Sequence, residues 1–194
     1  MPRGLRRLQD SGESHFVTFS CYHRQPYSAS AEVFDLFVHC VEDMRRRFEL
    51  CVYGYVVMPE HVHLLLSEPP HSKLADAIHY LKLSFAKRLR SRYPEHPGTF
   101  WQKRYYDRNV RDYREFTVKL RYIQSPEEWH WSSYRHYALR ETGIVEIESE
   151  WTARDREHKA REGQRGYSFA QVSAQNRGAN LGHQANGSRR VATT

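Results

Sequence analysis

The sequence predicts one α+β domain of the ferredoxin-like sandwich type, with an antiparallel or mixed sheet and helices on one face. Strand-like segments alternate with segments whose apolar residues recur at helical spacing, in the order β-α-β-β-α-β-α. One pair of neighbouring strands is joined by residues 58–60 alone, which suits a hairpin or a single strand with an interrupting bend. The length of 194 residues is enough for one domain with a substantial core.

The first half of the chain supplies three strands and one helix. Residues 15–22, HFVTFSCY, are rich in β-branched and aromatic side chains and read as a strand. Ser30 can cap a helix that continues to Phe48, because apolar side chains recur there at helical spacing. Residues 50–57 and 61–66 then read as two strands around the short connection.

The second half supplies two further helices and a strand. Residues 72–93 form a long helix with one apolar and one basic face, and residues 100–111 mix aromatic and basic side chains in a strand. A capping box of Asp112 and Glu115 begins the last helix, residues 113–123.

The last helix contains two tyrosines that its pattern separates. Phe116, Leu120 and Ile123 form a stripe that faces the core. At about 100° per residue, Tyr113 falls close to this stripe and is expected in the core. Tyr122 falls roughly 120° away from the stripe, so it is free to face a site.

The charge balance favours a polyanionic partner. Thirty Lys and Arg against 23 Asp and Glu give a net charge of +7, so nucleic acid is the first candidate and an anionic membrane surface the second. No apolar run is long enough to span a bilayer, and no hydrophobic segment follows the basic N-terminus. Three isolated cysteines predict neither a disulfide framework nor a paired-cysteine zinc site, and we expect a cytoplasmic protein.

The ends of the chain differ from its middle. We expect residues 1–13 to be flexible and the folded domain to span residues 14–151. From residue 152 to 194 the sequence is charged and then rich in Gly, Ser, Asn and Gln, with too little apolar surface to offset the entropy of ordering. This composition predicts a disordered tail.

Two histidines interrupt the apolar strand of residues 61–66. On a strand, His61 and His63 project to the same face, while Val62 points to the other face, toward the core. Two neutral imidazoles held in this way can bind a divalent metal. The alternative is a pair of polar side chains on the solvent face of a half-covered strand.

These segments resemble the single-tyrosine transposases of the HUH class, named for His-hydrophobic-His, and most of all the REP-associated tyrosine transposases of bacteria, which have an IS200-like transposase domain. The matching segments cover most of residues 14–151, and they are YGYVVMPEHVHLLL (53–66), AIHYLKLSFAKRL (77–89), FWQKRYYDRNVRD (100–112), KLRYI (119–123) and EEWHWSSYRHY (127–137).

The resemblance implies an HUH endonuclease type of fold and a metal-assisted attack of a tyrosine on one strand of DNA. It implies that Tyr122, in the context LRYI, is the nucleophile and that His61 and His63 hold Mg²⁺ or Mn²⁺. The product would be a 5′-phosphotyrosine and a free 3′-hydroxyl, so that the DNA can be rejoined. The implied partner is single-stranded DNA with palindromic, REP-like hairpins, bound in the bacterial nucleoid by a monomer or homodimer.

The chain departs from this family after the tyrosine. Relatives carry an Asn four residues on, which would complete the metal site as a third ligand, and here that position is Pro126. Proline should end the helix near Gln124, and residues 125–128 then read as a fresh helical turn. Glu127 or Glu128 could replace the missing ligand. We expect weakened metal binding and impaired cleavage, with DNA binding less affected.

The second helix and the strand that follows it could form a DNA-binding surface, or a basic face that is merely solvated. Cations would bind phosphates, and Trp101 or Tyr105 would stack on unpaired bases. The candidate cations are Lys82, Lys87, Arg88, Arg90, Lys103, Arg104 and Arg108.

Three functions therefore remain open. The first is a DNA strand transferase, and the second is a hairpin-binding protein that has lost cleavage. The third, a small metal-dependent hydrolase that uses the histidines without the tyrosine, lacks an acid or base of its own.

Overall fold

The computed structural model describes residues 14–26, 30–94, 99–125, 129–153 and 156. The predictions for residues 1–13, for the fresh turn at residues 126–128 and for most of the tail lie outside these residues. The chain divides into two units, residues 1–148 and 149–194, which are described separately. In the second unit the Ser149 backbone N–H donates to Thr152 Oγ1 (2.8 Å) at the start of a helical turn.

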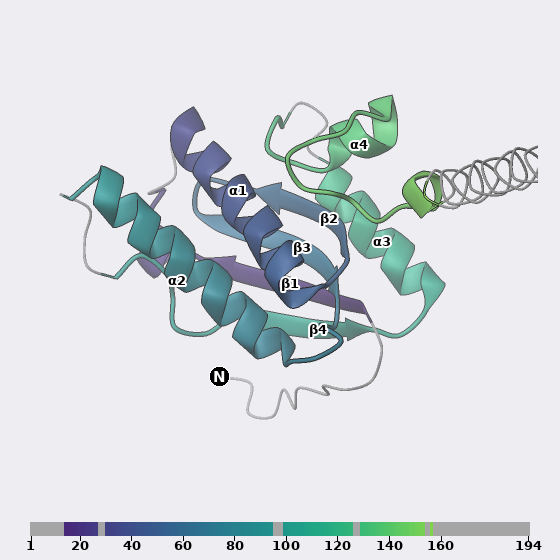
Figure 1. Ribbon diagram of the computed structural model, residues 1–194, viewed down its shortest axis with the longest axis horizontal. Coiled ribbons are helices and arrows are strands. Elements are labelled where there is room, and N and C mark those ends of the chain that lie inside the picture. The colour runs from purple at the N-terminus through teal and green to yellow at the C-terminus, as the bar shows by residue number, and fades with distance from the viewer. Residues whose placement is uncertain (1–13, 27–29, 95–98, 126–128, 154–155, 157–194) are drawn as a thin grey trace, which may run out of the picture. The chain divides into compact units, whose positions relative to one another are not determined.

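The first unit is built on a four-stranded antiparallel sheet. Its order is β2-β3-β1-β4, and the chain order β-α-β-β-α-β gives the predicted ferredoxin-like arrangement. The elements are β1 (Ser14–Ser20), α1 (Ala31–Phe48), β2 (Val52–Val57), β3 (His61–Ser67), α2 (Leu74–Arg92), β4 (Tyr106–Val110), α3 (Tyr113–Gln124) and α4 (Tyr134–Leu139), with a short 3₁₀ turn at Tyr22–Arg24 (Figure 1).

Helices α1 and α2 cover one face of the sheet and α3 lies on the other, so the prediction that the helices share one face is correct for α1 and α2 but not for α3 (Figure 1). Alternate side chains of β1 pack in different clusters, one on each face of the sheet. Val17 and Phe19 pack in the larger cluster with α1 and α2, while Phe16 packs in a smaller cluster with Ile123 of α3. The smaller cluster fixes the position of α3 over the middle of the sheet.

The outer edge of β2 is covered by later parts of the chain. The Val57 N–H donates to the Trp131 carbonyl (3.0 Å), and the Ser133 N–H donates to the Tyr55 carbonyl (2.9 Å). The Trp129 indole N–H also donates to the Val57 carbonyl (2.6 Å). These bonds anchor the segment before α4 and leave less of the sheet edge open to pairing with another chain.

Two predictions about local structure are wrong. Tyr113 is 79% exposed and not part of the core, because a helical wheel gives the direction of a side chain but not how far the packed surface extends under the first turn. The strand predicted over residues 100–111 is confined to Tyr106–Val110. Trp101 instead packs in the core against Phe19 and Phe85, and its indole N–H donates to the Lys82 carbonyl (3.1 Å).

Helix α3 begins and ends where the sequence indicates. The Glu115 N–H donates to Asp112 Oδ1 (2.7 Å), which is one half of the predicted capping box. The helix ends at Gln124, before Pro126. In the described part of the chain, no helix is both long and apolar enough to cross a membrane.

Candidate active site

The two histidines of β3 project side by side from the sheet face that α3 covers. Their ring centroids are 4.8 Å apart with the planes at 79°, and Val62 between them packs in the core under α1 and α2. Strand alternation accounts for this arrangement, which is the one that the sequence predicts.

Neighbouring polar groups orient both imidazoles through the same ring nitrogen. Nδ1 of His63 lies 2.7 Å from Oγ1 of Thr18, which is opposite His63 on the neighbouring strand β1. Nδ1 of His61 lies 2.9 Å from a carboxylate oxygen of Glu60. Nε2 is therefore the nitrogen that each ring has left for a ligand. A hydrogen bond from the far nitrogen to a hydroxyl or carboxylate is the usual way in which proteins orient a metal-binding histidine.

The Nε2 atom of His63 is buried and has no hydrogen-bond partner among the described residues. Burial, together with the nearby His61 and Lys119, lowers the pKa of His63 to about 4. The ring is therefore neutral at physiological pH, and its Nε2 can present a lone pair. A buried polar atom without a partner is costly, and a bound cation would satisfy it.

The donor set fits a divalent metal through two imidazoles. Within the described ranges, no group of three His, Cys, Asp or Glu side chains is placed to hold a metal ion. Pro126, Glu127 and Glu128, the positions that the sequence analysis considers for a third ligand, lie outside those ranges.

Tyr122 extends from α3 toward the histidine pair. Phe116, Leu120 and Ile123 pack α3 against the sheet, which leaves Tyr122 at the edge of the packed surface with 56% of its area exposed. Its ring meets the His63 ring edge to face, with 5.2 Å between the centroids. The structure thus brings the predicted nucleophile and the predicted metal ligands together.

A third ring completes this cluster. Phe16 of β1 stacks on His63 at 5.4 Å and 18°, and it meets Tyr122 edge-on at 6.1 Å. The ammonium group of Lys119 lies 4.6 Å from the centroid of the Phe16 ring. Sequence reasoning missed Phe16, Thr18, Glu60 and Lys119. Two of these could have been found from the sequence: Glu60 adjoins His61, and Lys119 lies one helical turn before Tyr122.

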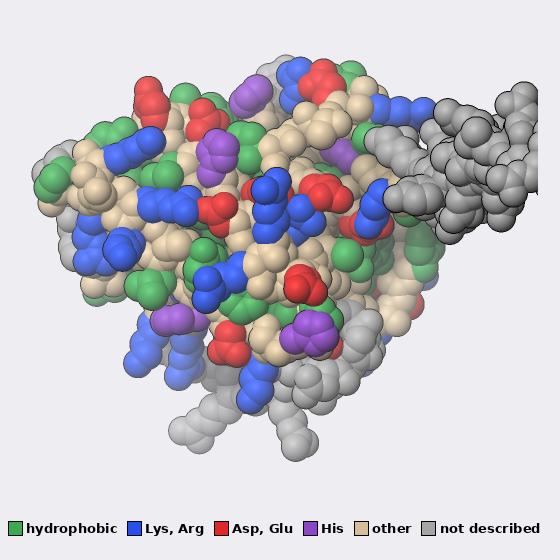
Figure 2. Space-filling view, viewed as in Figure 1, with side chains coloured by type: hydrophobic (Ala, Val, Ile, Leu, Met, Phe, Trp, Pro, Cys, Tyr) green, Lys and Arg blue, Asp and Glu red, His purple; other side chains and the backbone are tan. Residues whose placement is uncertain are grey.

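Most of the predicted DNA-binding residues lie away from this cluster. Lys82, Lys87, Arg88 and Arg90 belong to α2, which covers the opposite face of the sheet. On that face Lys and Arg side chains lie among Asp and Glu side chains (Figure 2). Arg88 forms an ion pair with Asp43 of α1 (2.6 Å).

The remaining candidates divide between two places. Lys82, Trp101, Lys103 and Tyr105 line one groove between α2 and the segment before β4, but Trp101 is only 9% exposed and offers no free ring face for stacking. Arg104 is exposed. Arg108 lies on β4 on the same face as Phe16, and it forms an ion pair with Glu115 of α3.

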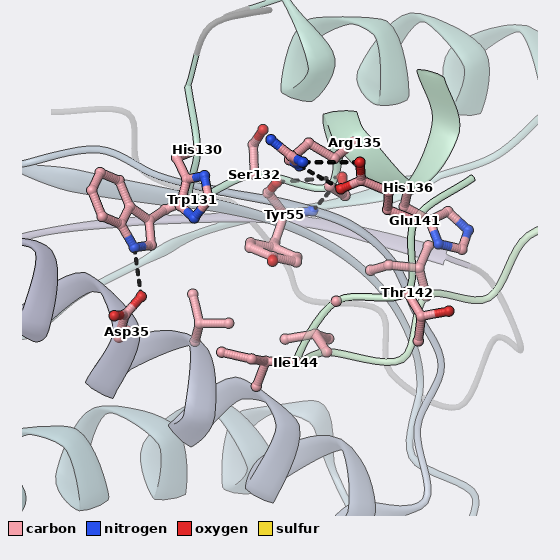
Figure 3. Close-up of a pocket in the computed structure, with 15 residues that line it drawn as sticks. Asp35, Tyr55, His130, Trp131, Ser132, Arg135, His136, Glu141, Thr142 and Ile144 are labelled. Atoms are coloured by element: carbon pink, nitrogen blue, oxygen red, sulfur yellow. Dashed lines mark hydrogen bonds and ion pairs between the residues drawn. The ribbon is translucent and has the colours of Figure 1, made fainter. Parts of the chain in front are cut away.

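A separate pocket of about 260 Å³ lies between α1, β2 and the segments around α4 (Figure 3). Asp35, Arg135 and Glu141, which line the pocket, all have partners. The Trp131 indole N–H donates to Asp35 (2.8 Å), and Arg135 binds both carboxylate oxygens of Glu141 (2.6 and 2.9 Å). Burial raises the pKa of Tyr55, on the pocket floor, to about 12. The pocket thus offers little to a phosphoryl-transfer reaction.

Comparison with one solved structure supports the fold. A REP-associated tyrosine transposase, solved bound to a REP hairpin, is similar with a TM-score of 0.61 and 18% identity, over 76% of this chain and 93% of that one. A protein from Deinococcus radiodurans described as a "putative transposase" matches with a TM-score of 0.46 and 24% identity, over 64% and 97% of the two chains. No curated protein sequence matches the chain.

The sheet order β2-β3-β1-β4 with two helices on one face defines a ferredoxin-like α+β fold, and the REP-associated tyrosine transposase shares this fold. Residues 9–126, more than half of the chain, match the family described as "Transposase IS200 like". The chain therefore belongs to the IS200-like transposase family.

Proposed function

We propose that this protein cuts and rejoins single-stranded DNA at palindromic, REP-like hairpins through a covalent bond to Tyr122. The observation that supports this most directly is the position of Tyr122, whose ring meets His63 of the histidine pair at 5.2 Å. An exposed phenol beside two oriented imidazoles suits an attack on a phosphodiester that lies on the surface of the protein.

In the proposed reaction the Tyr122 hydroxyl oxygen attacks the scissile phosphorus and loses its proton. A bond forms between that oxygen and phosphorus, and the bond between phosphorus and the 3′-oxygen of the preceding nucleotide breaks. The 3′-oxygen leaves and takes up a proton. The protein then carries the 5′ end of the downstream DNA as a phosphotyrosine, and a 3′-hydroxyl can reverse the exchange at the same or another site.

The residues of β3 and its neighbours prepare the site for this step. Thr18 and Glu60 fix the two imidazoles, and His61 and His63 would hold Mg²⁺ or Mn²⁺ through Nε2. Such an ion, when bound, polarises the scissile phosphate and stabilises the charge that develops on its oxygens. Imidazole ligands make Mn²⁺ the easier ion to account for.

DNA as the substrate is supported by charge and by the solved relative. The net charge of +7 favours a polyanion, and the REP-associated transposase with this fold was solved with a REP hairpin. The candidate cations on α2 lie across the sheet from Tyr122. In this proposal they hold the hairpin or flanking DNA, and the residues around α3 hold the cleaved linkage.

The test is a covalent adduct. Single strands that contain a palindromic hairpin, labelled on the 3′ side, are incubated with the protein and Mn²⁺ and run on a denaturing gel. We expect a labelled protein band that is absent for Tyr122→Phe and present for Tyr113→Phe, a control change on the same helix at a largely exposed ring. Cleavage without an adduct that survives Tyr122→Phe would favour hydrolysis by the histidines instead.

The second candidate function is hairpin binding without cleavage. It is favoured by Pro126, which stands where relatives carry a metal-binding Asn. The outcome that identifies it is a hairpin shifted in a native gel and left uncut with either Mg²⁺ or Mn²⁺.

A further inference from the structure

Lys119 is a half-buried lysine at the edge of the aromatic cluster formed by Phe16, His63 and Tyr122. Its ammonium group lies over the Phe16 ring at 4.6 Å, and that same ring contacts both His63 and Tyr122. On α3, Lys119 precedes Tyr122 by three residues, so the two side chains project from neighbouring positions on the helix surface. The cation therefore lies beside the proposed nucleophile.

Lys119 forms no ion pair with a carboxylate of the described residues. Five other cations of the unit are paired with carboxylates: Arg45 and Arg46 with Glu42, Arg88 with Asp43, Arg108 with Glu115, and Arg135 with Glu141. Glu115, the acidic residue one turn before Lys119 on α3, is already bound to Arg108 and to the Arg111 backbone N–H. Within the described ranges, the close contact of the Lys119 ammonium group is thus the face of the Phe16 ring, while Arg108 and then Lys119 lower the pKa of Glu115.

An ammonium group in this position is suited to an anion that arrives with the substrate. A phosphodiester carries one negative charge, and it gains more on its non-bridging oxygens when a fifth oxygen attacks phosphorus. A fixed cation next to the attacking hydroxyl stabilises the attacked state more than the resting state. Its contact with Phe16 holds the flexible side chain near the site before DNA binds.

We propose that Lys119 binds the phosphodiester that Tyr122 attacks, through its ammonium group and a non-bridging phosphate oxygen. This assignment depends on the proposed function for its catalytic consequence, but not for the binding itself. The chemical class of ligand is a nucleic-acid phosphodiester. Lys119 acts by binding the reacting group, beside the histidine pair.

Binding is tested without any cleavage. The lysines of the whole protein are converted to ¹³C-dimethyl-lysine, which keeps their charge, and the protein is titrated with the dinucleotide thymidylyl-(3′→5′)-thymidine while NMR spectra are recorded. We expect the signal that disappears in Lys119→Arg to shift saturably. The signal of Lys73, an exposed residue at the start of α2, should stay in place. An unmoved Lys119 signal would overturn the assignment, whether or not the protein cuts DNA.

The catalytic role is tested by removing the charge of Lys119 and, separately, the charge of the cleaved linkage. On the strand that the wild-type protein cleaves, Lys119→Met should slow adduct formation by about 100-fold, Lys119→Arg much less, and Lys73→Met not at all. With an uncharged methylphosphonate at the cleaved linkage, Lys119→Met and wild type should react at similar rates. An equal loss on both DNAs would show that Lys119 only supports the structure. If wild type forms no adduct, the proposed function fails, and the dinucleotide titration alone decides the role of Lys119.

Discussion

Gly54 of β2 lies directly beneath Leu120 of α3. A Cβ atom added at Gly54 would lie 3.0 Å from Leu120 Cδ1, 3.2 Å from Ser133 Oγ and 3.6 Å from Ile123 Cγ2. The absence of a side chain at this one position allows α3 to approach the sheet closely. Because α3 carries Tyr122, the distance between the tyrosine and the histidine pair depends on this contact.

Gly54→Ala should therefore weaken the site as well as the fold. We expect the free energy of unfolding to fall by about 1–3 kcal/mol, which is typical of overpacking, and adduct formation to slow because Leu120, on the same helix as Tyr122, must give way. Urea unfolding and the gel assay measure the two effects. Gly143→Ala is the matched control, because nothing lies within 4 Å of a Cβ atom added there. Equal behaviour of the two variants would show that the close approach is unimportant.

The sequence predicts much of the candidate site because the residue periods of a strand and of a helix are regular. Alternation along β3 puts His61 and His63 on one face, and the helical wheel separates Tyr122 from the core stripe of α3. These relations are local, so one sequence is enough to derive them. That α3 lies over the same sheet face as the histidines follows from tertiary packing, which one sequence does not contain.

Contacts between distant segments account for what the sequence does not show. Thr18 meets His63 only because β1 pairs with β3 in one register, and a shift by one residue would turn Thr18 to the other face. Arg88 reads as a free cation until α1 brings Asp43 to it. Trp101 lies in a run of aromatic and basic residues that is typical of an exposed strand for base stacking. In the structure β4 begins only at Tyr106, and Trp101, before it, is buried.

The hydrogen bond between Thr18 and His63 should support metal binding. Thr18→Val keeps the shape of the side chain but removes the oxygen 2.7 Å from His63 Nδ1, so the imidazole loses its fixed orientation. We expect Mn²⁺ affinity, measured by calorimetric titration, to fall by about 10- to 100-fold. Thr117→Val removes a hydroxyl that donates to the Tyr113 carbonyl on the exposed side of α3, and it should leave the affinity unchanged. Unchanged affinity in Thr18→Val would exclude this orienting role.

His15 forms a buried ionic cluster on the face of the sheet opposite to Tyr122. Its Nδ1 lies 2.8 Å from Asp107 and its Nε2 lies 3.0 Å from Glu68, and the ring is fully buried. Burial alone would lower the pKa of His15, but hydrogen bonds and charge from Asp107 and Glu68 outweigh it and raise the pKa. A neutral ring can donate from only one nitrogen, so bonding to both carboxylates requires the protonated ring.

Replacing His15 should destabilise the protein in a pH-dependent way. His15→Gln leaves the buried carboxylate of Asp107 and the half-buried carboxylate of Glu68 without their cation, and we expect a loss of about 3–5 kcal/mol in the free energy of unfolding. Because the folded-state pKa is raised, the stabilisation is complete below the unfolded pKa of about 6.5 and declines as pH rises through the folded value. Urea unfolding over a pH series measures this. A difference from wild type that does not change with pH would contradict the charged ring.

His63 should produce the opposite pH dependence. Its folded-state pKa of about 4 lies below the unfolded value, so between these pH values the unfolded chain binds a proton at this ring and the folded protein does not. The free energy of unfolding should therefore fall as pH decreases from about 6.5 to about 4, by roughly 3 kcal/mol in total. In His63→Phe, unfolded in urea with a metal chelator present, this part of the slope should be missing. His39→Gln, at an exposed position on α1, should keep the wild-type slope. If His63→Phe loses stability with acid as steeply as wild type does, the ring is not held neutral, and its readiness to bind a metal at neutral pH needs another explanation.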